Sequence, residues 1–271
     1  MNMAKLKKDE MTAEDLNEFV RTNSDFAFEM RVLTQLRADG FDCSHSGTYR
    51  DPVTDKIRQF DIRATIRRGD SALGLAVECK NLRSNNPLLL SSVPRTASEA
   101  FHEFLEHQPQ VGGPISHRLT GENSFYRPGL MVGKNTDQVG RNLSGRLDSN
   151  DEATFEKLNQ AVNSCHDFVR SLSEKASPRR KAVVPLLVVP SGLLWQVEYS
   201  PDGVIATKPH QVKRATLFLD HAWPVPGVYG STISYRLSHV EFVTFEALPG
   251  IGESYFGQGG FFPFEGSPAQ K

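Results

Sequence analysis

The sequence predicts an α/β protein, because segments with helical periodicity and segments with strand periodicity occur in the same chain. Residues 26–38 carry apolar side chains at helical spacing, which defines one apolar helix face. Residues 59–66 alternate apolar and polar side chains, as expected for a strand that buries one face. Residues 182–189 form an apolar run that is typical of a strand buried on both faces.

The length of the chain fits one large domain. A single domain commonly runs to about 200–250 residues, and this chain has 271. We therefore expect a single domain over residues 1–271, with a core at about residues 12–210 and a C-terminal extension at about residues 211–271.

The first expected element is a helix over residues 12–38 that is divided near residues 22–24. Thr12 is suited to cap its start, since an N-cap hydroxyl accepts a hydrogen bond from an unpaired backbone N–H. Acidic residues follow in the first turn, where the helix dipole favours them, and Gly40 is suited to end the helix. Three strands are expected next, at residues 41–49, 58–66 and 72–80.

The second half of the chain is expected to combine an insertion with further strands. Residues 81–128 lack a regular pattern apart from a predicted helix at residues 96–107, so we expect a helical and loop insertion after the third strand. The other expected elements are a short strand at 129–134, a long helix at 153–175, the buried strand at 182–189 and a hairpin of residues 193–199 and 204–209. A further strand at residues 235–248 extends the sheet towards the C-terminus, and residues 249–271 show no periodicity.

Composition and motifs limit the partners, the cellular location and the classes of protein that the sequence supports. The formal net charge is -1, so a contact with nucleic acid depends on a local basic patch. The three cysteines lack CxxC spacing, which indicates reduced thiols and argues against a disulfide framework or a zinc site. We expect no signal peptide and no membrane span, and hence a cytoplasmic protein. No Walker loop, GxGxxG or GxSxG motif supports an NTPase, a dinucleotide-binding protein or a serine hydrolase.

Two acidic side chains are expected to face each other across the hairpin of residues 58–80. Alternation places Asp61 on the polar side of the first strand, and a two-residue turn at residues 69–70 puts it directly opposite Glu78. Opposed carboxylates about 5 Å apart repel each other unless a positive charge lies between them. A divalent cation is the natural candidate, because Mg²⁺ is typically held by one or two carboxylates. The small residues Gly74 and Ala76 are expected to leave this face open to a ligand.

Two further side chains complete the candidate site. Lys80 lies on the same side of its strand as Glu78, where an ammonium can stabilise charge on a phosphate or orient an attacking water. Glu29 borders the apolar face of its helix and is expected to point inward, where it completes the metal shell or holds a water of the metal.

The order of these residues resembles the PD-(D/E)xK nuclease superfamily, which includes restriction endonucleases and Holliday-junction resolvases. The resemblance covers roughly residues 26–80: Glu29, then Asp61 in Gln-Phe-Asp-Ile-Arg-Ala, then Glu78-Cys79-Lys80. It implies a restriction-endonuclease-like core with a central mixed sheet flanked by helices, and Mg²⁺-dependent (or Mn²⁺-dependent) endonuclease cleavage of DNA. It also implies that Asp61 and Glu78 are metal ligands with Lys80 beside them. Phe60 stands where the literal motif has proline.

Basic residues around the hairpin favour a polynucleotide partner. The candidates for phosphate contacts are Arg63, Arg67, Arg68 and Arg83. The sequence leaves open the choice between DNA and RNA, the biological pathway, and whether a homodimer or a partner subunit directs the protein to its target.

Two other interpretations of the same residues stay open. The acidic and basic side chains of the hairpin can form the solvated face of an antiparallel sheet, linked by cross-strand ion pairs. Alternatively, the chain is a catalytically inactive nucleic-acid-binding or protein-interaction module on the same fold.

Overall fold

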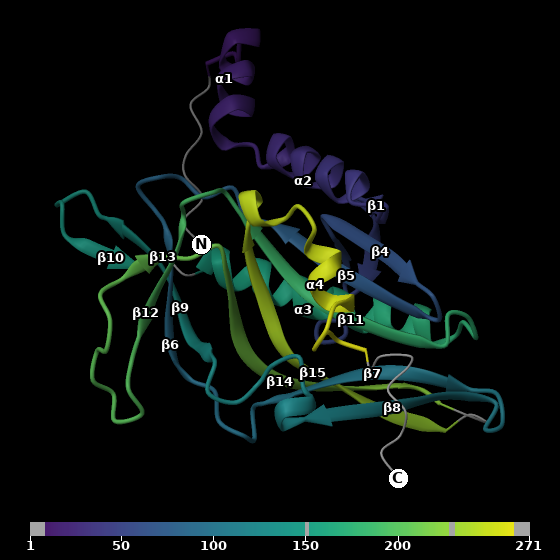
Figure 1. Ribbon diagram of the computed structural model, residues 1–271. Coiled ribbons are helices and arrows are strands. Elements are labelled where there is room, and N and C mark those ends of the chain that lie inside the picture. Colours follow the sequence, from purple (N-terminus) through teal and green to yellow (C-terminus); the bar gives the residue numbers. More distant parts are fainter. Residues whose placement is uncertain (1–8, 150–151, 228–230, 263–271) are drawn as a thin grey trace.

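A large mixed β-sheet forms the body of the protein, and helices pack on its two faces (Figure 1). The computed structural model describes residues 9–149, 152–227 and 231–262. Within these residues thirteen strands belong to the main sheet, while β2 (Thr48–Arg50) and β3 (Ile57–Gln59) form a separate hairpin. The predicted α/β class is confirmed.

The N-terminal helical segment is divided as predicted, into α1 (Ala13–Asn23) and α2 (Phe26–Ala38). Thr12 caps α1: its hydroxyl accepts a hydrogen bond from the Asp15 N–H at 3.1 Å, and the Asp15 carboxylate accepts one from the Thr12 N–H at 2.8 Å. After α2, Gly40 adopts a left-handed φ of 86°, which glycine reaches without a steric penalty. Helix α1 projects from the body, whereas α2 lies against the sheet (Figure 1).

Four neighbouring strands carry the residues singled out in the sequence: β1 (Asp42–His45), β4 (Ile62–Arg68), β5 (Ser71–Cys79) and β11 (Arg180–Val189). The first three are antiparallel, and β11 runs parallel to β5. Arg68 pairs with Ser71 and Ile62 pairs with Val77, so the two-residue turn and the predicted register are confirmed.

The sheet continues beyond β11 through six more strands in spatial order: β15 (Thr232–Thr244), β14 (Arg214–Pro226), β9 (Met131–Arg141), β6 (Leu88–Pro94), β12 (Leu194–Glu198) and β13 (His210–Gln211). Three strands branch from this path: β7 (Phe101–Gln108) pairs with β11 and with β8 (Gly113–Thr120), and β10 (Leu147–Ser149) pairs with β9. Short 3-10 turns lie at Gly121–Asn123 and Phe245–Ala247.

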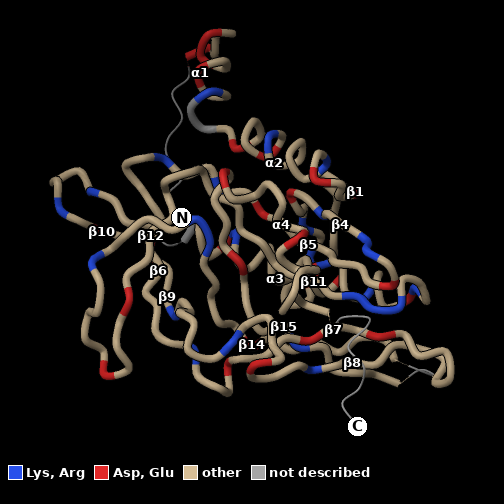
Figure 2. The backbone as a smooth tube through the Cα atoms, viewed as in Figure 1, with Lys and Arg blue, Asp and Glu red and all other residues tan. Residues whose placement is uncertain are grey.

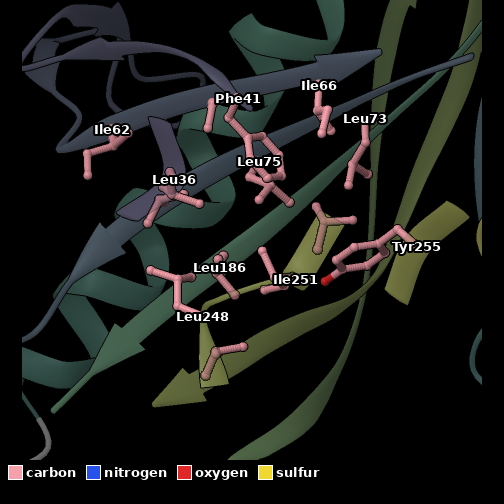
Figure 3. Packing of buried hydrophobic residues seen from close by; sticks show 14 of the residues in the cluster. Leu36, Phe41, Ile62, Ile66, Leu73, Leu75, Leu186, Leu248, Ile251 and Tyr255 are labelled. Atoms are coloured by element: carbon pink, nitrogen blue, oxygen red, sulfur yellow. The ribbon is translucent and has the colours of Figure 1, made fainter. Parts of the chain in front are cut away.

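Helices cover opposite faces of the four-stranded region. Helix α2 and the short α4 (Ile251–Phe256) pack on one face, where Leu36 and Ile251 join the apolar side chains of β4, β5 and β11 (Figure 3). The long helix α3 (Glu152–Ser173) packs on the other face through Phe168, Leu172 and their neighbours. Strand β5 is therefore buried along its whole length.

The predicted helix at residues 96–107 is wrong, and with it the expected helical character of the insertion. Residues 101–108 form β7, and the segment between β5 and α3 consists mainly of strands. The spacing of Phe101, Phe104 and Leu105 fits a helix face, but pairing with β8 and β11 buries all three in a sheet.

Three other differences concern the second half of the chain. Residues 204–209 contribute an isolated bridge from Ile205 to Tyr199, and the described strand that pairs antiparallel with β12 is β13. The pattern does not predict β14, because Pro224 and Pro226 disfavour a strand. The predicted strand at residues 235–248 is confirmed but lies earlier, as β15, and α4 follows in the segment without periodicity.

Among the helices of the described residues, none combines the length and the apolar character that a membrane crossing requires.

Candidate functional site

Asp61 and Glu78 converge at one end of the four-stranded region, where β4 begins and β5 ends. The Asp61 N–H points to Glu78 Oε1 at 3.4 Å, and Asp61 Oδ2 accepts a hydrogen bond from the Cys79 N–H at 2.8 Å. The hairpin register brings the two side chains together, as the alternation of β4 and β5 predicts.

The ammonium of Lys157, on α3, lies between the two carboxylates. Its Nζ is 3.0 Å from Asp61 Oδ1, 2.8 Å from Asp61 Oδ2 and 3.0 Å from Glu78 Oε2. The side chain of Glu78 is 1% exposed, that of Asp61 13% and that of Lys157 20%. The positive charge that the opposed carboxylates require is therefore supplied, in this structure, by a lysine.

Sequence reasoning missed Lys157. A signal was present, since helical spacing places Lys157 one turn before Ala161, and Ala161, Cys165 and Phe168 follow at helical spacing and are all buried. A lysine in line with these residues points towards the sheet, but the spacing does not say which strand residues it meets.

Burial and mutual charge shift the pKa values of the site. Burial, and next the Asp61 carboxylate, raise the pKa of Glu78 to about 8 in spite of the neighbouring ammonium. Burial by itself lowers the pKa of Lys157, but the charges of Glu78 and Asp61 outweigh it and hold that pKa above its ordinary value. Lys157 is therefore a permanent cation at neutral pH.

Lys80 follows β5 and is half-buried at the same end of the sheet. Its backbone N–H continues the ladder to β11 by donating to the Val188 carbonyl at 2.9 Å. Burial lowers the pKa of Lys80, and the charge of Asp25, just before α2, opposes this shift. A lysine with a lowered pKa gives up its proton more readily, which suits a group that orients or deprotonates water.

Glu29 lies in the first turn of α2 and does not join the Asp61–Glu78 pair directly. Its Oε2 is 3.4 Å from His45 Nε2 at the end of β1. Burial and the charge of Asp61 raise the pKa of Glu29, so its carboxyl group is within electrostatic reach of the pair. This position fits a residue that holds a water near the pair better than a direct ligand.

The carboxylate oxygens of Asp61 and Glu78 suit a hard divalent cation that takes few ligands from the protein. Within the described residues, no three His, Cys, Asp or Glu side chains converge closely enough to hold a metal ion together. Mg²⁺ nevertheless commonly uses one or two carboxylates and completes its octahedral shell with water and substrate phosphate. Asp61 and Glu78 already surround one positive charge, so the pair suits such an ion.

The sheet face beside the pair is not open, contrary to expectation. A Cβ added at Gly74 would lie 2.8 Å from Cζ of Phe168 and 3.4 Å from Cδ1 of Leu172, and Ala76 is fully buried. The small residues of β5 admit α3, not a ligand. A ligand of Asp61 and Glu78 would therefore have to approach from the end of the sheet.

Three of the four candidate arginines line one hollow on the α3 side of β1 and β4. Arg63, Arg67 and Arg68 surround it together with Lys175, and its volume is about 560 Å³. Arg63 also donates to Asp167 of α3 at 2.9 Å, and Arg68 pairs with Glu253. Basic residues mark this region along β4 in Figure 2. Arg83 is exposed in the loop after β5 and does not line the hollow.

Comparisons of the chain with models of protein families, with curated proteins and with solved structures found no match.

Proposed function

We propose that the protein is a Mg²⁺- or Mn²⁺-dependent nuclease that hydrolyses phosphodiester bonds in DNA, with a role in restriction, defence or DNA processing. The observation that carries the proposal is the convergence of Asp61 and Glu78 on a single positive charge at the end of a sheet. Opposed buried carboxylates destabilise a fold unless a cation lies between them, and one or two carboxylates are the protein ligands that Mg²⁺ commonly uses.

The arrangement of elements supports the proposed restriction-endonuclease-like core. A mixed sheet of β1, β4, β5 and β11 has α2 on one face and α3 on the other, and the acidic pair lies at its end. This agrees with the sheet and the order of residues that the sequence resemblance implies.

Each side chain has a distinct task in the proposed reaction. Asp61 and Glu78 would hold the divalent ion, which would supply Lewis acidity at the phosphate and lower the pKa of a bound water. Lys80, half-buried at the same end of the sheet, stabilises the developing charge or accepts a proton from the attacking water. Glu29 positions water near the pair through its carboxylate.

The test is cleavage of supercoiled plasmid and single-stranded DNA by the purified full-length protein with Mg²⁺ or Mn²⁺. The variants Asp61→Asn and Lys80→Met should each slow cleavage by about 100-fold or more, the usual effect of losing one charge-stabilising group. Matched controls are Asp55→Asn and Lys56→Met, because both residues are exposed in the turn before β3. These controls should cleave at the wild-type rate.

The second candidate is a non-catalytic nucleic-acid-binding or protein-interaction module. The observation that favours it is the ion pair of Lys157 with Asp61 and Glu78, which neutralises the carboxylates without a metal. If no protein cuts DNA with either metal, while wild-type and Asp61→Asn proteins bind DNA equally, the binding module is the better conclusion.

A further inference from the structure

We propose that the ammonium of Lys157 occupies the divalent-cation position of the Asp61–Glu78 pair and leaves it when the cation binds. Lys157 is then an internal counter-ion that competes with the metal. The inference rests on the proposed function, because it assumes that the pair binds a divalent ion.

Both cations need the same oxygens. Lys157 Nζ lies 2.8–3.0 Å from both oxygens of Asp61 and from Glu78 Oε2. A divalent ion held by the two carboxylates needs these same atoms. Two positive charges cannot share that position, so binding of the metal requires the ammonium to move.

The Asp61–Glu78 pair needs a counter-charge while no metal is bound. Glu78 is almost fully buried and Asp61 is largely buried. When both groups are ionised in such surroundings they repel each other and are poorly solvated, which opposes folding unless a cation lies between them. With Lys157 between them, the metal-free protein folds with the pair already assembled.

Lys157 can leave this position without a change in the fold. In the described part of the chain, the hydrogen bonds found for its ammonium all go to Asp61 and Glu78. The ammonium stands at the end of a flexible four-carbon stem, and a fifth of the side chain is already exposed. Rotation of the side chain is enough to bring the ammonium into solvent.

The test compares Mn²⁺ affinity by isothermal titration calorimetry for wild-type protein, Lys157→Met and the double variant Lys157→Met/Asp61→Asn. Methionine retains much of the apolar stem and removes the charge. Lys157→Met should bind Mn²⁺ about 10-fold more tightly or better, because no ammonium must be displaced. Its metal-free melting temperature should fall below that of the wild type and recover on addition of Mn²⁺. The double variant should lose the tight binding.

A measurement on the wild-type protein keeps the test independent of how the variant folds. Reductive methylation followed by peptide mass spectrometry reports the accessibility of each lysine. The rate at Lys157 should rise several-fold when Mg²⁺ is added, while the rate at the exposed Lys56 stays constant.

Three results would overturn the inference, and they differ in what they say about the proposed function. Equal or weaker Mn²⁺ binding by a folded Lys157→Met protein removes the competition but leaves a metal-dependent nuclease in place. An unchanged methylation rate at Lys157 in wild-type protein saturated with Mg²⁺ also removes the competition and leaves a metal-dependent nuclease in place. Absence of Mn²⁺ binding by all proteins removes both the inference and the metal site of the proposed function.

Discussion

Replacing Glu78 by glutamine should change how the stability of the metal-free protein depends on pH. The folded protein raises the pKa of this carboxyl from an ordinary value of 4.5 to about 8. Between these values the folded state holds a proton that the unfolded state has released. The free energy of unfolding therefore falls as the pH rises from about 4.5 to about 8, and Glu78→Gln removes this fall.

The size of the effect follows from the shift. One pKa unit corresponds to about 1.4 kcal/mol, and linkage over the interval from pH 6.5 to 8 predicts a loss on the order of 1–2 kcal/mol for this group. At lower pH, buried histidines change the free energy of unfolding in the opposite direction. Burial lowers the pKa of His102 to about 4, so its contribution rises with pH and is complete above its unfolded value near 6.5.

The assay is urea unfolding at pH 6.5, 7.25 and 8 in the presence of a chelator, for wild-type protein, Glu78→Gln and the control Glu122→Gln. Glu122 is an exposed glutamate in the 3-10 turn after β8, so its replacement should leave the wild-type slope intact. The reasoning is refuted if wild-type and Glu78→Gln proteins lose the same free energy of unfolding over this interval. It is refuted equally if the stability of the wild type relative to Glu78→Gln increases with pH.

Three further substitutions test other parts of the structure. Gly74→Ala should lower the free energy of unfolding by about 1–3 kcal/mol in urea titration, because the added Cβ meets the Phe168 ring of α3 at 2.8 Å. Thr12→Ala should weaken α1 by about 1 kcal/mol through loss of the capping box, seen as faster amide exchange in α1 with unchanged global unfolding. Amide exchange in α1 at the wild-type rate would contradict this. The double change Arg67→Ala/Lys175→Ala should weaken binding of DNA of any sequence, measured by fluorescence anisotropy. The slope of the logarithm of the binding constant against the logarithm of the salt concentration should become less steep by about 2. An unchanged slope would exclude a contact between phosphates and the residues of this hollow.

The surroundings of Asp61 and Glu78 differ from those of a solvated polar sheet face. The interpretation as a solvated sheet face requires exposed side chains, whereas Glu78 is almost fully buried under α3. Arg63, on the same face, meets Asp167 of α3 instead of an acidic side chain of β5. The polar side of this hairpin is therefore an interior surface, where the protonation state and the counter-ion of a carboxylate affect stability directly.

Local geometry by itself determined much of the candidate site. The two-residue turn at residues 69–70 sets the register of β4 and β5, and strand alternation then puts Asp61 and Glu78 on one side. Capping by Thr12 and the end of α2 near Gly40 are likewise decided within a few residues of each position. Such features are readable in a sequence because hydrogen bonding and dihedral preferences act over short distances along the chain.

Contacts between distant segments decided the rest. Lys157 meets Asp61 across 96 positions of the chain, and no local pattern specifies which strand residues a helix covers. Residues 101–108 have apolar spacing compatible with a helix, yet β11 and β8 pair with them as a strand. Burial under α3 also raises the pKa of Glu78, because the sheet becomes a low-dielectric interior only when α3 packs on it. The sequence determined which chemical groups share a strand face, and tertiary packing decided what neutralises them and from which side a ligand can approach.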